Sequence, residues 1–578
     1  MNKTFLLTLL VVLLGFLRIG AQTTPATSDP RDPFFAPKSQ QEQASKVQHI
    51  HSDESGVKPD QYEGNLVFSG HVKFEHQGSI LTADKVVLYQ KENFLKAIGN
   101  VTLLNADGTQ ITAEEMEYDG NTQRGIARKN VVLTDPKQTI KTETLYYDRV
   151  PNTAYFNTGG TITDGQNIMY TKSATYYVTT KDIDFVGHST IDAKDYTIES
   201  DNIKTNQATQ ISRFLAATTI RSKANPRNYV YTELGDYDGK TGISHLKKNS
   251  RIYYNDKILT GDDLIYNRNT GFGKGTGNIK LDDPKEKRFI KGGYGEIYEL
   301  KDSAMITNKP YAVKIFEKDS MYIAAEKFLS FQKADSTKQK KSFLRAYQKV
   351  RIFKTNMQAR ADSLSYNETD GILHLMKKPI LWTGTKQVTG DEVMVYMNTT
   401  TQDIDSIKVI GNAFAISKVD SLNMKDEFHQ IKSKWMGIYF DKGQIKKAVA
   451  VQNAQSIAYA DDKNETTQEI TRIGVAVSVC GEIAADFIEK RLETVTCRVG
   501  AQSDIYPMSF MSKEKRFFPD FNWNTKDRPQ KYQDIFEDTP NYPETVYESD
   551  NSLYEKAEAE RLKQEEKNKP KTPVREKR

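Results

Sequence analysis

Cysteine, strong net charge and long hydrophobic runs are all scarce in this 578-residue chain. Two cysteines exclude a disulfide-dense scaffold and a multi-cysteine zinc or iron–sulfur array. Hydrophobic residues make up 37% of the chain and the mean hydropathy is −0.64, which excludes a multi-pass protein with apolar helical spans. A net charge of +5 is too small to predict a nucleic-acid-binding surface. In contrast, 30 Tyr and 26 Phe are too many for a mostly disordered chain.

The first 21 residues have the pattern of a secretory signal peptide. Lys3 provides a basic start, the run from Phe5 to Leu17 is apolar, and Ile19-Gly20-Ala21 forms a small-residue cleavage site. A membrane anchor is the alternative, but the apolar run is short and Arg18 ends it. Removing Lys3 and Arg18 lowers the formal net charge from +5 to +3, so we expect a nearly neutral exported protein.

The two ends of the mature chain are polar. Residues 22–60 contain several prolines and then a Gln-rich stretch, which predicts a flexible linker. Residues 555–578 contain nine Lys/Arg and six Glu with almost no apolar side chains. We therefore expect residues 511–578 to form an irregular and charged disordered C-terminal tail.

A short phrase recurs along the chain: an apolar residue, any residue, a small residue and an acid, with an aromatic residue soon after. Clear copies are Leu81-Thr82-Ala83-Asp84, Ile111-Thr112-Ala113-Glu114 and Leu259-Thr260-Gly261-Asp262. Anchored on the acid, thirteen copies lie between residues 84 and 482, and most follow the previous copy by 28 to 36 residues. This spacing indicates structural repeats of about 30 residues.

A second phrase, Gly-polar-Val or Gly-polar-Ile, lies between the copies of the first. It occurs as Gly70-His71-Val72, Gly99-Asn100-Val101 and Gly277-Asn278-Ile279. The residues around it alternate between apolar and polar, which predicts two strands and two turns in each repeat. Two short segments, near 322–332 and 342–348, break this alternation, and we expect them to be helical insertions.

The order of apolar residues inside the phrase predicts a bend in the strand. In an ideal strand Ile111 and Ala113 point to one side, whereas Met116 and Tyr118 point to the other. A bulge or corner at the small residue would turn both sets toward one interior between two sheets. We interpret the acid after this corner as structural rather than catalytic.

The apolar-x-Ala-Asp phrase, spaced by Gly-Asn-Val and repeated behind a signal peptide, resembles the organic-solvent-tolerance (OstA)-like, LptA-type domain family. The resemblance is closest over residues 60–220, and weaker copies reach residue 510. It implies an all-β, elongated and repetitive two-sheet β-jelly-roll stack with an open groove, here of about thirteen repeats. We expect a first segment at 61–320 and a more divergent one with insertions at 321–510. The chain departs from the family pattern because it is much longer than one LptA-type unit.

The same resemblance implies a periplasmic bridge or assembly factor in lipopolysaccharide transport to the outer membrane. Its expected partners are lipopolysaccharide, through the lipid A acyl chains, and other transport proteins, through β-strand edge pairing. Outer-membrane association is also implied, and no nucleic-acid partner is expected. A lipid chain of about 14 carbons costs on the order of 10 kcal/mol in water, and an apolar groove removes that cost.

Alternate strand residues would line such a groove. An ordinary dry core between two sheets is the alternative for each of them. The candidates for the lipid groove are Val72, Phe74, Leu81, Val101, Leu103, Ile111, Val131 and Ile140.

No catalytic residues, metal site or cofactor are expected. Residues 292–298 and Lys314 imitate a kinase Gly-rich loop and its lysine, but no His-Arg-Asp or Asp-Phe-Gly segment follows. The eight histidines are scattered and form no H-E-x-x-H motif. Cys480 and Cys497 are 17 residues apart, and a hairpin turning at residues 488–491 would bring them together as a structural disulfide.

Two other classes of exported protein stay open. One is a β-helix that binds or cleaves polysaccharide, and the other is a structural or adhesive stack. A β-helix has coils of about 20 to 25 residues, whereas these repeats are longer. A polysaccharide enzyme would also gather carboxylates in one cleft, rather than carry one acid in each repeat.

Overall fold

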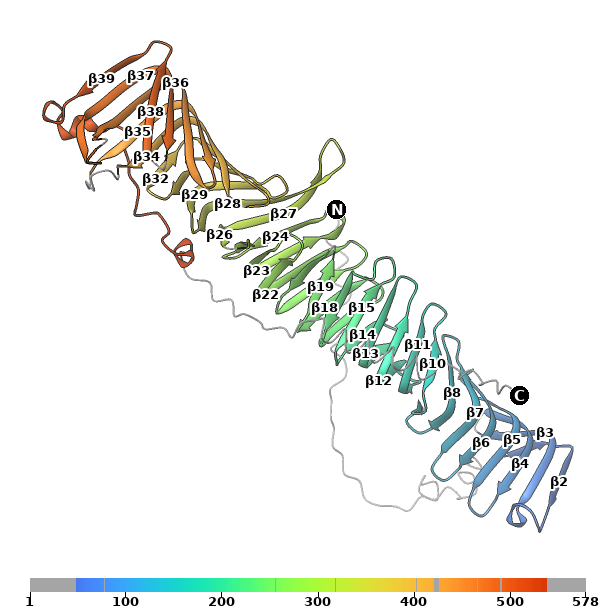
Figure 1. Ribbon diagram of the computed structural model, residues 1–578. Coiled ribbons are helices and arrows are strands. Elements are labelled where there is room, and N and C mark those ends of the chain that lie inside the picture. Colours follow the sequence, from blue (N-terminus) through green and yellow to red (C-terminus); the bar gives the residue numbers. More distant parts are fainter. Residues whose placement is uncertain are drawn as a thin grey trace, which may run out of the picture. The chain divides into compact units, whose positions relative to one another are not determined.

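The computed structural model describes residues 48–537, apart from 77, 255, 318, 402, 420–425, 465 and 489–490. This part of the chain consists of strands and short 3-10 helices and contains no α-helix (Figure 1). The predicted all-β class is therefore confirmed, while the jelly-roll arrangement and the number of repeats stay predictions. Among these residues no helix is both long and apolar enough to cross a membrane. The chain divides into two compact units, Met1–Pro136 and Lys137–Arg578.

Unit 1 is an antiparallel meander of long strands. Each strand from β3 to β6 pairs with the next along the chain, and β1 and β2 pair with the two halves of β3. The short helix η2 (Tyr62–Gly64) precedes β3. The strands are β1 (Gln48–His51), β2 (Glu54–Val57), β3 (Leu66–His76), β4 (Ser79–Tyr89), β5 (Phe94–Leu104), β6 (Gln110–Asp119) and β7 (Arg124–Thr134).

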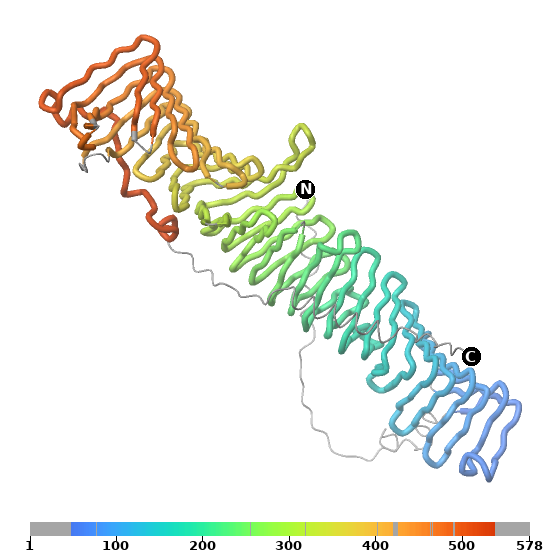
Figure 2. The backbone as a smooth tube through the Cα atoms, in the orientation of Figure 1, coloured from blue at the N-terminus to red at the C-terminus, as the bar shows by residue number. Residues whose placement is uncertain are grey.

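Unit 2 repeats the antiparallel pattern from β8 onward, and Figure 2 traces its successive turns from cyan to red. Its first strands are β8 (Thr139–Asp148), β9 (Thr153–Phe156), β10 (Gly160–Thr163), β11 (Ile168–Tyr177), β12 (Asp182–Asp192), β13 (Tyr196–Asn206), β14 (Ile211–Phe214), β15 (Thr218–Ser222), β16 (Tyr229–Thr232), β17 (Leu234–Asp238), β18 (Ile243–Lys248), β19 (Arg251–Tyr254), β20 (Lys257–Thr260), β21 (Asp263–Asn267), β22 (Phe272–Asp283) and β23 (Arg288–Tyr298).

After η3 (Glu299–Lys301) the same pattern continues. The remaining strands are β24 (Ser303–Thr307), β25 (Tyr311–Ile315), β26 (Ser320–Ala324), β27 (Lys327–Ala334), β28 (Lys340–Lys354), β29 (Met357–Asn367), β30 (Ile372–Met376), β31 (Ile380–Thr383), β32 (Lys386–Thr389), β33 (Glu392–Met397), β34 (Ile404–Lys418), β35 (Phe428–Asp441), β36 (Gln444–Lys463), β37 (Ile470–Ile488), β38 (Arg491–Arg498) and β39 (Gln502–Tyr506).

Each long strand carries a corner where the regular pairing is interrupted. Between β3 and β4 the register moves from Ser69↔Lys85 to Val72↔Ala83, so Gly70 and His71 lie opposite the single residue Asp84. Gly70 and His71 both have positive φ, 76° and 42°. Left-handed pairs of this kind recur at 99–100, 129–130, 277–278, 308–309, 348–349, 377–378, 411–412 and 452–453.

The corner turns both halves of a strand toward the interior. In β6, Ile111 and Ala113 before the corner and Met116 after it are all buried, and Tyr118 is half-buried. An unbroken strand would expose one of the two sets, because its side chains alternate between faces. The predicted corner is therefore present, and it lies at the acid, one residue after the small residue of the phrase.

The acid of the repeat phrase holds this corner. Asn100 Nδ2 donates a 2.9 Å hydrogen bond to Asp84 Oδ2 across the strand pair. The acid accepts from a left-handed asparagine in other repeats as well. These are Glu114 with Asn130, Glu233 with Asn249, Asp262 with Asn278 and Asp391 with Asn412. These bonds support the structural interpretation of the acid.

Glycine begins many of these pairs because the acid packs directly on its backbone. At Gly411, φ is 70° and an added Cβ would lie 2.1 Å from Asp391 Oδ2. A side chain there would meet both backbone strain and a steric clash. The Gly-polar-Val phrase is thus the sequence signature of the corner.

Residues 507–537, which we call the strap, run back along unit 2 after β39. They contain η4 (Met508–Phe510), η5 (Lys513–Arg516) and η6 (Tyr532–Ile535). Aromatic side chains of the strap, among them Phe518 and Trp523, pack against Phe414, Ile416 and Phe428. Phe414 and Ile416 alternate along β34 with side chains that join the main core, so the strap covers the opposite face of this sheet.

Three parts of the chain differ from the sequence-based expectations. The segments expected to be helical insertions are strands: 322–332 lies in β26 and β27, and 342–348 lies in β28. In β28 the buried residues Leu344 and Ala346 alternate with exposed ones, so the period is two rather than 3.6. Strands β1 and β2 lie inside the range expected as linker, and the strap lies inside the range expected as tail.

Candidate functional site

An apolar cleft lies in the C-terminal part of unit 2. It encloses about 780 Å³ of empty space, including the part open to solvent. Strands β31, β32 and β34 to β38 build its walls. Its apolar lining comes mainly from Val388, Ile407, Ile431, Ile438, Phe440, Ile445, Ile457, Ile483, Phe487, Leu492 and Val495.

The corners place these side chains on two walls that face one cleft. In β35 the pairing with β36 is interrupted between Lys432 and Trp435. Ile431 lies before this corner and Ile438 lies after it, yet both line the cleft. Strands β34, β35 and β36 therefore contribute to both walls.

Small side chains leave the space open. Ala415, Ala448, Ala458 and Ala485 are part of the cleft lining. Earlier in unit 2, the corresponding interior is filled by larger buried side chains such as Leu264, Leu281, Ile290, Phe328 and Leu344. Replacing large residues by alanine along facing strands removes volume that the strand spacing cannot recover, because the backbone pairing fixes the distance between strands.

The chemistry of the lining is that of a binding surface for hydrocarbon. Lys386 and His429 are the only lining side chains with titratable groups. No group of three or more His, Cys, Asp or Glu that could hold a metal occurs among the residues that the structure describes. The cleft lining also contains no carboxylate side chain.

The interior on the N-terminal side of this cleft contains a buried ionic cluster. Arg288 Nη1 lies 2.8 Å from Glu368 Oε2, and Arg288 Nη2 lies 3.2 Å from Asp283 Oδ2. The same Nη2 donates a 2.9 Å hydrogen bond to Ser330. One guanidinium therefore serves two buried carboxylates, and burial raises the pKa of Glu368 above its usual value. The cluster lies at strand ends, where β22 ends, β23 begins and β29 has just ended.

The sequence-predicted groove residues lie elsewhere, on β3 to β8. Six of them are buried and 0% to 3% exposed: Val72, Phe74, Val101, Ile111, Val131 and Ile140. Leu81 and Leu103 are only half-buried. None of the eight lines the cleft. The sequence signal that could have located the cleft is the alternation of alanine with larger apolar residues in 445–460 and 474–485.

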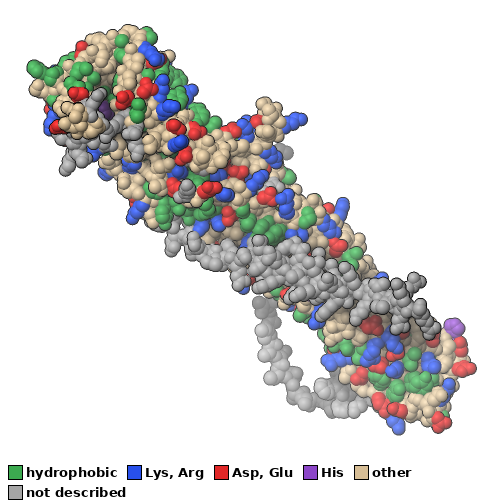
Figure 3. All heavy atoms as spheres, viewed as in Figure 1, with side chains coloured by type: hydrophobic (Ala, Val, Ile, Leu, Met, Phe, Trp, Pro, Cys, Tyr) green, Lys and Arg blue, Asp and Glu red, His purple; other side chains and the backbone are tan. Residues whose placement is uncertain are grey.

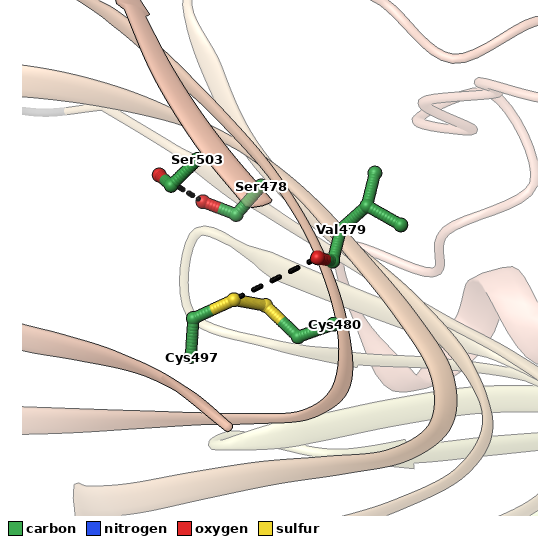
Figure 4. The surroundings of a disulfide bond; sticks show 5 residues. All are labelled: Ser478, Val479, Cys480, Cys497 and Ser503. Atoms are coloured by element: carbon green, nitrogen blue, oxygen red, sulfur yellow. Dashed lines mark hydrogen bonds between the residues drawn. A yellow bond between two sulfur atoms is a disulfide. The ribbon is translucent and has the colours of Figure 1, made fainter. Parts of the chain in front are cut away.

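Cys480 and Cys497 form a disulfide beside the cleft (Figure 4). Their Cα atoms are 5.7 Å apart, within the usual range for a disulfide. The antiparallel pairing of β37 with β38 places Ile483 opposite Cys497 and brings the two cysteines together. Because Ile483, Leu492 and Val495 all line the cleft, the disulfide ties together two strands of its wall.

The C-terminal end of unit 2 exposes strand edges and apolar side chains. Within the described residues, β38 and β39 pair only with β37. Several large apolar side chains are exposed around them, namely Ile488, Val495, Val499, Ile505 and Tyr506. In the face seen in Figure 3, hydrophobic side chains gather over this end of unit 2.

These features define a repetitive antiparallel β-protein with an apolar cleft between two walls. Residues 44–201 match the family model of OstA-like proteins, and residues 312–401 match the family model described as LptA/(LptD N-terminal domain) LPS transport protein. The two matches confirm the resemblance to the OstA-like, LptA-type family that the repeat phrase indicated.

One similar solved structure is that of LptH from Pseudomonas aeruginosa. It is described as the LptA homologous periplasmic component of the lipopolysaccharide transport device. The match has 12% identity and a TM-score of 0.20, and it covers 26% of this chain and 95% of that one. No curated protein matches the chain.

Proposed function

We propose that this protein is a non-enzymatic bridge or assembly factor in periplasmic lipopolysaccharide transport to the outer membrane. In this proposal the apolar cleft of unit 2 holds the lipid acyl chains. The observation that carries it is the cleft itself, a cleft lined mainly by apolar side chains in a chain with OstA-like and LptA/LptD-type stretches. The lining is mostly apolar and contains no carboxylate, which favours carriage over catalysis.

The lining of the cleft suits hydrocarbon, because most of its side chains are apolar. Each buried methylene contributes about 0.8 kcal/mol, so burying ten methylenes of an acyl chain would contribute about 8 kcal/mol. This energy is enough to keep a lipid bound to the cleft in an aqueous compartment. The open side of the cleft leaves room for a polar headgroup outside.

The strand edges of unit 2 provide a way to join another transport protein. An unpaired edge presents a row of free N–H and C=O groups that a strand of a partner can extend. Beside β38 and β39, the exposed side chains of Val499 and Ile505 would be covered by such a partner. We propose this end of unit 2 as the partner-binding edge.

The eight groove candidates on β3 to β8 are kept as a second part of the proposed lipid path. Most of them are almost fully buried, so an acyl chain could reach them only if the two walls separated. The cleft of unit 2 needs no such movement, and it is therefore the first place to test.

Site-specific photo-crosslinking in cells tests this function. A photoreactive residue at Ile431, Phe440 or Leu492 should give a lipopolysaccharide adduct, because all three line the cleft. The matched control is Tyr439, which lies next to Phe440 on β35 but is half exposed and outside the cleft lining. Absence of an adduct at all three cleft positions, in proteins that reach normal levels, would refute the proposal.

A further inference from the structure

A second cleft in unit 2 has a different chemistry. It encloses about 1020 Å³ of empty space, including the part open to solvent, and lies between strands β13 and β21 with η3 at one side. The apolar cleft described above, which we call the acyl cleft from here on, has no lining residue in common with it. Its most frequent lining residue is tyrosine: Tyr196, Tyr229, Tyr237, Tyr253, Tyr254 and Tyr266.

The tyrosine rings form flat surfaces with polar edges. Tyr229 and Tyr253 are stacked, with ring centroids 4.0 Å apart. Tyr196 meets Tyr237 edge to face at 6.1 Å. The buried hydroxyl of Tyr253 has no hydrogen-bond partner among the residues that the structure describes. Buried hydroxyls are almost always paired, so this one points to a polar group that enters the cleft.

The cleft also contains an arginine that no acid neutralises. The Arg268 guanidinium lies 4.5 Å from the ring centroid of Tyr196 and 5.4 Å from that of Tyr237. Within the described part of the chain, its guanidinium forms no ion pair or hydrogen bond. Its side chain is exposed, so its donors are accessible from the open side.

One of the two acidic side chains of the lining is already engaged. Glu299 accepts a 2.5 Å hydrogen bond from the hydroxyl of Tyr266 and a 3.1 Å bond from Asn228 Nδ2. The other acidic lining residue, Asp195, is exposed at the rim. The arginine is therefore the group in this cleft that remains able to bind a charged ligand.

We propose that this tyrosine cleft binds a phosphorylated saccharide unit. The apolar face of a sugar ring packs on tyrosine rings, and its hydroxyls can pair with Tyr253 and with the amide of Asn269. A phosphate matches the planar, multiple donors of Arg268. The cleft thus combines a surface for a ring, partners for hydroxyls and a cation for an anion.

The inference rests on the proposed function only for the source of the sugar. The headgroup of a glycolipid and a free sugar phosphate share the chemistry that the cleft recognises. The two clefts of unit 2 would then take the two different parts of an amphiphile, the acyl chains and the phosphorylated sugar.

Calorimetric titration of the purified full chain tests the site. The probes are glucosamine 1-phosphate, glucosamine and inorganic phosphate. We expect glucosamine 1-phosphate to bind tightest and Arg268→Gln to weaken it by at least about tenfold, since a charged hydrogen bond is lost. Tyr253→Phe should weaken it severalfold. The control is Arg345→Gln, because Arg345 also lies over a ring, that of Phe331 at 5.1 Å, but outside this cleft.

Three outcomes would overturn the inference: no binding of any probe, equal affinity for inorganic phosphate and the sugar phosphate, or no effect of Arg268→Gln. Failure here is separable from failure of the proposed function, because adducts at Leu492 report on the acyl cleft alone. The source of the sugar follows from a photoreactive residue at Tyr229 in cells. A lipopolysaccharide adduct there supports a glycolipid headgroup, whereas titration binding without an adduct supports a free sugar phosphate.

Discussion

The strap should detach from unit 2 when Gln387 is replaced by alanine. Gln387 is 2% exposed, and its side-chain amide makes three hydrogen bonds. Nε2 donates to the Asn522 carbonyl (2.7 Å), and Oε1 accepts from Asn524 N (2.8 Å) and from Trp382 Nε1 (3.1 Å). Two lost bonds cost about 1 kcal/mol each, and the buried Trp382 N–H left without a partner costs about 1–3 kcal/mol. The strap should therefore lose about 3–5 kcal/mol of its docking free energy.

Hydrogen exchange followed by mass spectrometry measures this loss directly. In Gln387→Ala, backbone amides of residues 516–528 should exchange about 10² to 4 × 10³ times faster, which is the loss expressed as an opening equilibrium. The control is Gln166→Ala, since Gln166 is exposed in the turn between β10 and β11. Unchanged exchange across the strap in folded Gln387→Ala protein would show that the amide does not hold the strap.

Three further outcomes are expected. In chemical denaturation, Gly411→Ala should destabilise the protein more than Gly384→Ala, because both have positive φ but only Gly411 packs against an acid; equal losses would contradict the corner. Burial raises the pKa of Glu368, so its stabilising contribution is complete below about pH 4.5 and is lost as the pH rises through the raised pKa. Glu368→Gln should remove this part of the pH dependence of thermal unfolding. If the unfolding temperatures of the wild type and the variant ran parallel across this pH range, the contribution of Glu368 would be excluded. Reducing the disulfide, which spans 17 residues, should cost about 3 kcal/mol in urea unfolding, and an unchanged midpoint would contradict this.

The corner could be predicted from the sequence because its cause is local. Ile111, Ala113 and Met116 stand in an order that an unbroken strand cannot bury, and only a bend removes the conflict. What the sequence did not indicate is the partner of the acid. Asn100 and Asp84 are 16 residues apart in the sequence and lie on neighbouring strands. Their hydrogen bond can be recognised only when the pairing register of the two strands is known.

The cleft and the strap were missed for different physical reasons. The groove candidates were chosen where the repeat phrase is clearest, whereas the cleft depends on alanines such as Ala448 and Ala485 that the register brings to one space. The segments near 322–348 have apolar residues on both faces, and a strand bent at a corner imitates a helical stripe there. In the strap, the aromatic residues Phe517 and Trp523 indicate packing against the sheet. The polar composition of the surrounding residues led instead to the prediction of a disordered tail.

The ionic cluster around Arg288 sets where acyl chains can lie in unit 2 under the proposed function. Arg288 begins β23 and Glu368 directly follows β29, so parting these strand ends to admit a chain would separate the pair, and breaking a buried pair costs about 3–5 kcal/mol. Four methylenes gain only about 3 kcal/mol on burial, so the first part of a chain cannot offset that cost. The chains are therefore confined to the cleft on the C-terminal side of the cluster until most of a chain has moved. Glu368→Gln removes one carboxylate from this barrier, and it should extend lipopolysaccharide adducts to interior positions on the N-terminal side of the cluster, such as Leu264 on β21.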